Sequence, residues 1–205
     1  MVRKARKETH LHGVTLVDDY AWLREKESPE VTAYLEAENA YAEAGTEKLG
    51  PLREALYKEM LSHIKQTDVT VPYRDGAWWY YSRTEEGLQY GIYCRKRGDE
   101  AGPAADVAEE VVLDGNALAE GHAFFSFGDT AVSDDGKWVA YSTDLTGFRQ
   151  YTLHVKNLET GVTLPPAVER VGSVEWAADN ETLFYTVEDE EQKRQFQLYR
   201  HNAVQ

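Results

Sequence analysis

Serine, histidine and cysteine are the residues of this chain whose chemistry suits a nucleophile or a base. A serine nucleophile at the end of a strand needs Gly-x-Ser-x-Gly, because the glycines permit the sharp turn that exposes the hydroxyl. None of the seven serines has this surrounding sequence. Ser126, within Phe-Phe-Ser-Phe-Gly at residues 124–128, comes nearest but lacks the leading glycine. The serines therefore predict no acyl-transfer site in this chain.

The histidines and the single cysteine give a similarly negative prediction. His10 and His12 could chelate a metal from one strand, but two histidines near a terminus are more typical of solvated side chains. For His122 we expect a structural hydrogen bond. Cys94 cannot form an internal disulfide, and its apolar neighbours favour a buried, inert thiol. We expect no catalytic, cofactor-binding or metal-binding residue, and no cofactor.

Charge and hydropathy exclude several classes of partner. The net charge is −14, from 22 basic and 36 acidic side chains, which disfavours nucleic acid because phosphates are bound by Lys and Arg. A negative field could concentrate cationic substrates, but solubility alone is the favoured explanation of the charge. No apolar run approaches the ~18 residues of a membrane helix, so we expect no membrane partner. The basic residues 1–7 precede no apolar signal region, and the lone cysteine suits a reducing cytoplasm.

The elements that would position any site repeat along the second part of the chain. Three aspartate-led turns each precede, at the same distance, a tyrosine within an aromatic or β-branched run. The turns are Asp75-Gly76, Asp135-Gly136 and Asp179-Asn180, and the tyrosines are Tyr81, Tyr141 and Tyr185. A second strand then begins at Tyr90, Tyr151 or Phe196. Such spacing is typical of successive β-propeller blades, with the tyrosines buried at equivalent positions.

The first part of the chain has helical periodicity instead. Much of residues 8–66 is expected to be helical, with Ser28 and Pro29 as a start signal. Pro51 opens a second helix with an apolar stripe that includes Leu52, Leu56 and Met60.

These patterns predict a fold that is mainly β with an N-terminal α segment, a partial β-propeller of about two to three blades. The expected division is a helical segment at 1–70 and truncated blades at 71–205. Long loops are expected near residues 98–110 and 115–128. The aromatic run 78–81 is interpreted as a strand buried on both faces, with a stacking platform for bases or sugars as the weaker alternative.

Several runs of sequence resemble the prolyl oligopeptidase family of serine peptidases, and within it the oligopeptidase B branch. The similar runs are Asp-x-Tyr-x-Trp-Leu at 18–23, residues 64–72, 79–83, 113–122 and 133–153. The resemblance covers nearly the whole chain, and these runs are its most specific parts. Asp19 departs from the family, which usually has proline there.

The resemblance implies a seven-bladed propeller that covers a C-terminal α/β-hydrolase domain and admits only short peptides, cleaved after Arg or Lys. The helical segment packs on the hydrolase domain in that family. Serine, aspartate and histidine of the triad all belong to the C-terminal part, so no triad residue transfers to this sequence. The expected partners are that catalytic domain, the remaining blades and short basic peptides.

A different class of function stays open at this point. The chain could be a stand-alone interaction module, in which a propeller fragment completes its ring by oligomerising or by binding a partner. A reading frame that continues into Gly-x-Ser-x-Gly would favour the peptidase interpretation, whereas a natural stop would favour the module.

Overall fold

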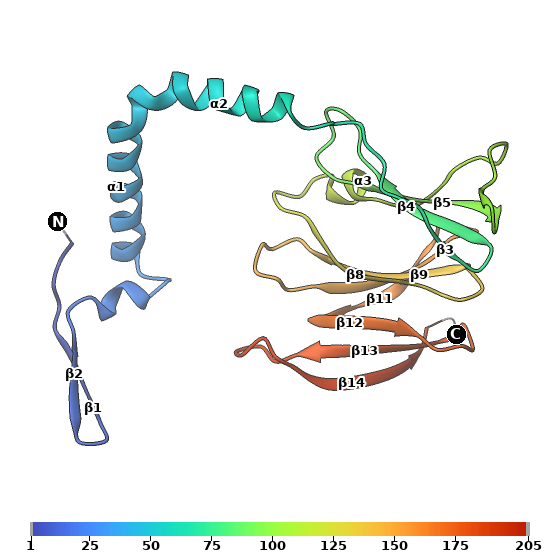
Figure 1. Cartoon of the computed structure of the whole chain (residues 1–205). Helices are drawn as coiled ribbons and strands as arrows, with labels where there is room; N and C mark the ends of the chain where they lie inside the picture. The colour runs from blue at the N-terminus through green and yellow to red at the C-terminus, as the bar shows by residue number, and fades with distance from the viewer. Residues whose placement is uncertain (1, 204–205) are drawn as a thin grey trace. The chain divides into compact units, whose positions relative to one another are not determined.

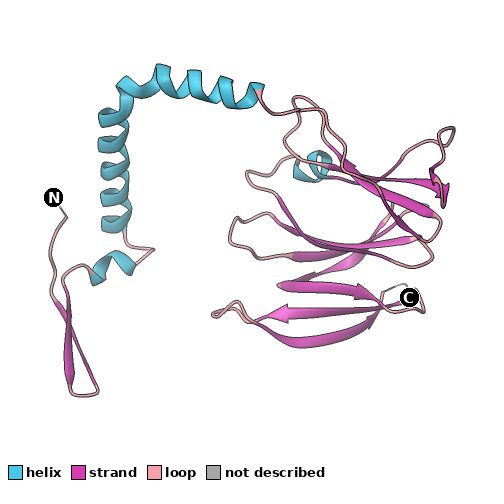
Figure 2. Cartoon of the chain, viewed as in Figure 1, coloured by secondary structure: helices cyan, strands magenta, loops and turns pink. Residues whose placement is uncertain are grey.

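The computed structural model describes residues 2–203, with the backbone alone described at residues 166 and 167. The chain divides into two compact units, Met1–Ile64 and Lys65–Gln205. The long helices lie in the first unit, and the larger sheets lie in the second (Figure 2).

The first unit begins with a β-hairpin, so the expectation that most of residues 8–66 would be helical is wrong at its start. Strands β1 (Lys7–Leu11) and β2 (Val14–Asp18) pair antiparallel, with Leu11 opposite Val14. The turn between them consists of His12 and Gly13, with φ of 50° and 78°. Two positive φ angles in a two-residue loop match the twist of a hairpin. This local turn therefore overrides the helical reading of the flanking residues.

Beyond the hairpin the helices appear where Ser28 and Pro29 predict them. The 3-10 helix η1 (Ala21–Arg24) precedes α1 (Pro29–Thr46), and η2 (Glu47–Leu49) leads into α2 (Gly50–Ser62). Trp22 fixes this start, because its Nε1–H donates to the Arg3 carbonyl at 2.9 Å and its ring meets Tyr34 edge-on at 6.0 Å. Arg3 in turn pairs with Glu30 of α1.

The apolar stripe of α2 has no cover within the described residues. Leu52, Leu56 and Met60 are about half exposed or more, and α2 has no buried residue. Most helical stability in proteins comes from packing an apolar face. The stripe is therefore a surface that needs a partner.

The second unit contains three antiparallel sheets that succeed one another along the chain (Figure 1). The first sheet has β3 (Tyr73–Asp75), β4 (Trp78–Arg83), β5 (Ile92–Asp99) and β7 (Glu110–Asp114), with β6 (Gly102–Pro103) at one end of β5. The second has β8 (Ser126–Val132), β9 (Trp138–Asp144), β10 (Thr152–Asn157) and β11 (Thr163–Glu169). The third has β12 (Val171–Trp176), β13 (Thr182–Glu188) and β14 (Gln195–Asn202). Two four-stranded meanders and a three-stranded one confirm the expected partial propeller.

The two regions expected as long loops contain some regular structure. The two-residue strand β6 lies in the first, and the short helix α3 (Gly115–Ala119) lies in the second. The Asp114 carboxylate accepts the main-chain N–H groups of Asn116 and Ala117, which caps α3.

Each neighbouring pair of sheets encloses its own apolar core. Between the first and second sheets, Trp78, Tyr80 and Leu113 pack with Val139 and Tyr141. Between the second and third sheets lies a cluster of Ala140, Leu153, Val171, Val174, Leu183 and Ala203. Successive residues of β9 therefore face opposite neighbours, which is why this strand is almost wholly buried.

The first strands of the second and third sheets, β8 and β12, have a bulge at corresponding positions. The Asp129 N–H donates to the Ser142 hydroxyl, and the Ser173 N–H donates to the Thr186 hydroxyl, both at 2.9 Å. A glycine precedes each bulge residue, and a Cβ at Gly128 would lie 2.4 Å from Ser142 Oγ. The Asp129 carboxylate then accepts the Val174 N–H at 3.0 Å and joins the two sheets.

The three repeated tyrosines occupy equivalent places opposite the next strand. Tyr81 pairs with Cys94, Tyr141 with His154, and Tyr185 with Tyr199. Tyr141 is buried, whereas the other two are half-buried. The expected register is confirmed, and full burial holds only for the tyrosine of the middle sheet.

Candidate functional site

The residues singled out for chemistry do not come together in the structure. Ser126 opens β8 and its hydroxyl donates to the neighbouring Phe127 carbonyl, with no helix following the strand. His10 lies on β1 with Nδ1 2.8 Å from Thr15 Oγ1, while His12 lies in the hairpin turn. The main-chain N–H of His122 donates to the Ala119 carbonyl, and its side chain is exposed.

Cys94 is buried at 1% exposure, as expected. Burial, with Glu109 nearby, raises the pKa of its thiol to about 12, which keeps it protonated and unreactive. Among residues 2–203, no three histidine, cysteine or acidic side chains are arranged to hold a metal ion. None of the described helices has the length and apolar character to cross a membrane.

A polar cluster occupies the face of the first sheet that points away from the second. The Tyr81 hydroxyl donates to Glu109 at 2.6 Å, and Arg83 donates to the same carboxylate at 2.9 Å. Burial, together with the hydrogen bond to the Glu109 carboxylate, raises the pKa of Tyr81. Burial alone would raise the pKa of Glu109, but the bonds from Tyr81 and Arg83 outweigh it and lower that pKa. All of these groups are partnered, so the cluster fixes the loop before β7 and leaves no free group for chemistry.

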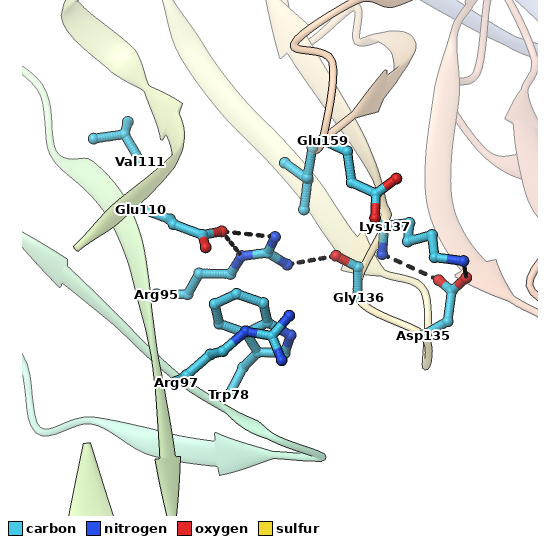
Figure 3. A pocket seen from close by; sticks show the side chains of 10 residues that line it. Trp78, Arg95, Arg97, Glu110, Val111, Asp135, Gly136, Lys137 and Glu159 are labelled. Atoms are coloured by element: carbon cyan, nitrogen blue, oxygen red, sulfur yellow. Dashed lines mark hydrogen bonds and ion pairs between the residues drawn. The ribbon is translucent and has the colours of Figure 1, made fainter. Parts of the chain in front are cut away.

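A cleft of about 520 Å³ lies between the first and second sheets, and Figure 3 shows the residues that line it. It opens at the end of the sheets where the Asp135-Gly136 turn lies. Three cationic and three acidic side chains line it around the indole of Trp78, with Gly136 also at its wall. The cations are Arg95, Arg97 and Lys137, and the acids are Glu110, Asp135 and Glu159.

Arg95 crosses the cleft and joins its two walls. Its guanidinium donates to the Glu110 carboxylate on β7 at 2.9 Å and to the Gly136 carbonyl of the next sheet at 2.5 Å (Figure 3). Its side chain is only 4% exposed, so the charge depends on these two partners. Arg95 is thus a positioning residue that fixes the turn of the second sheet against the first.

The Trp78 indole contacts two guanidinium groups. Arg95 Cζ lies 3.8 Å and Arg97 Cζ 4.4 Å from the centroid of its ring. Gly136 closes against the indole, with φ of +70°, and an added Cβ would lie 2.8 Å from Trp78 Nε1. A side chain at this turn would therefore be both strained and obstructed, which explains the glycine of the Asp-Gly turn.

The corresponding positions of the second sheet carry no cations. By strand pairing, Val155 takes the place of Arg95, and Asn157 takes the place of Arg97. The Asn157 carboxamide is occupied by the N–H groups of Glu159 and Thr160 in its own turn. In the third sheet Arg200 takes the place of Arg95, and Asn202 takes the place of Arg97. Arg97 is therefore the cation that is particular to the first sheet.

Sequence reasoning missed this cleft entirely. The indication was available in Arg95 and Arg97, which lie two residues apart on a strand and hence share a face. What the sequence did not supply was the register that places Arg97 opposite Trp78. Trp78 itself was correctly assigned to the core, with 8% of its surface exposed.

Comparison with known proteins gives one consistent family. Residues 1–203 match the family model described as the prolyl oligopeptidase N-terminal β-propeller domain. Dipeptidyl aminopeptidase BI of Pseudoxanthomonas mexicana is 42% identical over 193 residues, covering 88% of this chain and 27% of that protein. Protease 2 of Moraxella lacunata is 38% identical, covering 93% of this chain and 28% of that protein.

Solved structures agree over the whole chain. Oligopeptidase B from Leishmania major superposes with a TM-score of 0.90 at 29% identity, covering 100% of this chain and 31% of that one. Oligopeptidase B from Trypanosoma brucei, with covalently bound antipain, gives 0.85 at 33% identity, covering 100% and 30%. The chain thus spans less than a third of the length of these relatives.

Proposed function

This chain belongs to the prolyl oligopeptidase family, and we propose that it forms the N-terminal, non-catalytic portion of a serine oligopeptidase. The observation that carries the proposal is the family match over residues 1–203, a region without a nucleophile elbow in its sequence. The triad would come from a C-terminal α/β-hydrolase domain of the same protein. This arrangement assigns the blades a role in access and not in bond cleavage.

The proposed substrates are short peptides cleaved after Arg or Lys, with the propeller restricting entry to the catalytic domain. Similarity to two oligopeptidase B structures supports this class. The net charge of −14 suits basic peptides and opposes nucleic acid as a partner. A buried, unpaired Cys94 is consistent with the cytoplasmic location that we propose.

We further propose that residues 1–70 pack on the catalytic domain through the apolar stripe of α2. Leu52, Leu56 and Met60 support this, because a half-exposed stripe of this kind is stable when covered by another apolar surface. In the intact protein, Leu56→Gln should release this contact and lower activity. Lys58→Gln, a polar exchange two residues away on the same helix, is the matched control and should have little effect. Equal activity in both variants would show that the stripe is not part of the interface.

The test of the proposed function is an assay of the intact protein beside the chain of residues 1–205. The intact protein should hydrolyse an arginine or lysine ester, react with a serine-directed fluorophosphonate, and prefer basic to proline-containing substrates. The 205-residue chain should do none of these. Turnover by that chain, abolished by replacing one of its serines, would overturn the assignment. An intact protein with no labelled serine would favour an interaction module instead.

A further inference from the structure

The cleft of about 520 Å³ beside Trp78 contains one cation and one anion that form no ion pair with the described residues. Glu110 is occupied by Arg95, which donates to it through Nε and lies within ion-pair distance through Nη2. Asp135 accepts the Ser133 hydroxyl and the Lys137 N–H, and its carboxylate lies 3.4 Å from Lys137 Nζ.

Arg97 is the cation that remains. It is exposed, and its stacking on Trp78 is its only side-chain interaction with another residue in the described part of the chain. A guanidinium that lies over an aromatic ring can still donate its N–H groups to a planar acceptor. The geometry of two parallel N–H groups matches a carboxylate. Arg97 is therefore preorganised for a carboxylate that this part of the protein does not provide.

Glu159 is the anion that remains. It lies in the turn between β10 and β11, where its main-chain N–H is bound by Asn157, while its exposed carboxylate has no bond or ion pair with the described residues. Glu159 and Arg97 line the same cleft but come from different sheets. A ligand that satisfies both must carry a carboxylate and, within the width of the cleft, a positive group.

We propose that this cleft binds the C-terminal residue of a short basic peptide, with its carboxylate on Arg97 and its cationic side chain toward Glu159. The choice of a basic residue rests on the proposed function, since cleavage after Arg or Lys yields products with these two groups. The cleft has room for a residue of that size. The cleft is thus a product-binding site between two sheets of the propeller.

Calorimetric titration of the intact protein, its catalytic site first blocked with a fluorophosphonate, tests this site. The probes are the dipeptide Ala-Arg and its C-terminal amide. Ala-Arg should bind, and the amide should bind at least about tenfold more weakly, because it lacks the charged acceptor for Arg97. Failure of Ala-Arg to bind at about 10 mM, or equal affinity for the amide, would overturn the proposal.

Variants locate the binding within the cleft. Arg97→Gln should weaken Ala-Arg binding by about tenfold or more, and Glu159→Gln should weaken it to a smaller extent. Lys96→Gln is the matched control, because Lys96 is the adjacent cation of β5 and points to the opposite face. Equal losses in the Lys96 and Arg97 variants would show nonspecific attraction and refute the site.

The outcome is distinguishable from that of the proposed function. An intact protein without peptidase activity that still binds Ala-Arg through Arg97 would uphold the site and overturn the proposed function. An active peptidase that does not bind Ala-Arg would do the reverse.

Discussion

The second and third sheets place similar residues at corresponding positions but bury them very differently. Leu153 of β10 is 3% exposed, whereas Leu198, which lies 45 residues later on β14, is 70% exposed. Leu153 packs in the core shared with the third sheet. Leu198 faces away from the second sheet, where the described residues supply no cover. The difference teaches that a neighbouring sheet, and not the hairpin itself, determines what each strand buries.

The repeated tyrosines also differ in burial, although each faces a preceding sheet that is present. Tyr141 lies between sheets in the core of the first and second sheets, stacked on His154. Tyr185 stacks on Tyr199, which is itself exposed. Tyr141, the more deeply buried of the two, should therefore tolerate truncation least.

The largest expected effect is the loss of the Tyr141 ring. Tyr141→Ala should lower the free energy of unfolding by about 3–5 kcal/mol, because a large buried aromatic leaves a cavity. Tyr185→Ala is the matched control and should lower it by less, since its ring is only half-buried. Urea unfolding of both variants makes the comparison. Equal losses would contradict the contrast between the two sheets.

The paired leucines give the next largest effect. Leu153→Ala should cost about 2–5 kcal/mol, whereas Leu198→Ala should change stability by less than about 0.5 kcal/mol. Leu198→Ala should instead reduce binding of a hydrophobic dye to the 205-residue chain, because it removes part of an exposed apolar face. A destabilisation at Leu198 as large as that at Leu153 would mean that the outer face is already covered.

Two corresponding aspartates predict a pH dependence. Asp144 is 1% exposed and accepts the N–H groups of Thr146 and Arg149, whereas Asp189, 45 residues later, is half-buried and accepts those of Glu191 and Gln192. Burial alone would raise the pKa of Asp144, but the bonds from Thr146 and Arg149 hold it below its ordinary value.

The pKa of Asp144 is lower in the folded chain than in the unfolded chain. As the pH falls, the unfolded chain therefore binds this proton before the folded chain does. The stabilisation by ionised Asp144 is present above its ordinary pKa of about 4. It is lost as the pH falls through the lower pKa that Asp144 has in the folded chain. Asp144→Asn should therefore cost about 1–3 kcal/mol at pH 7 and progressively less below pH 4. Asp189→Asn, measured by the same urea titrations, should cost less. A loss at Asp144 that does not change with pH would contradict this origin.

The smallest effect is expected from the acidic loop of the third sheet. Glu188 ends β13 and Glu191 lies in the hairpin loop before β14, and we expect their charge to serve solubility alone. Replacing both with Gln in the intact protein should change kcat/KM for a dibasic peptide by less than about twofold at any salt concentration. A reduced dependence on ionic strength would show that this loop attracts substrate.

Much of this fold could be predicted from local residue types. Asp-Gly and Asp-Asn turns specify hairpins through their positive φ, and Gly136 and Asn180 have φ of 70° and 60°. Ser28 and Pro29 fixed the start of α1 for an equally local reason. The hairpin at residues 7–18 was missed because its His-Gly turn is a weaker signal than Asn-Gly or Asp-Gly.

The cleft could not be predicted in the same way, because it depends on contacts between distant residues. Arg95 and Gly136 are 41 residues apart, and their bond exists only once two sheets are adjacent. The sequence shows both residues but not that one reaches the other. Register and sheet order, which decide such pairs, are set by tertiary packing.

Hydrogen exchange of β14 in the intact protein and in the chain of residues 1–205 tests the central claim, that the third sheet is one blade of a longer propeller. The account predicts strong protection of the amides of Phe196 to Arg200 in the intact protein and rapid exchange in the 205-residue chain, where this strand is exposed. Equally rapid exchange in both would contradict the claim that a further blade covers this face.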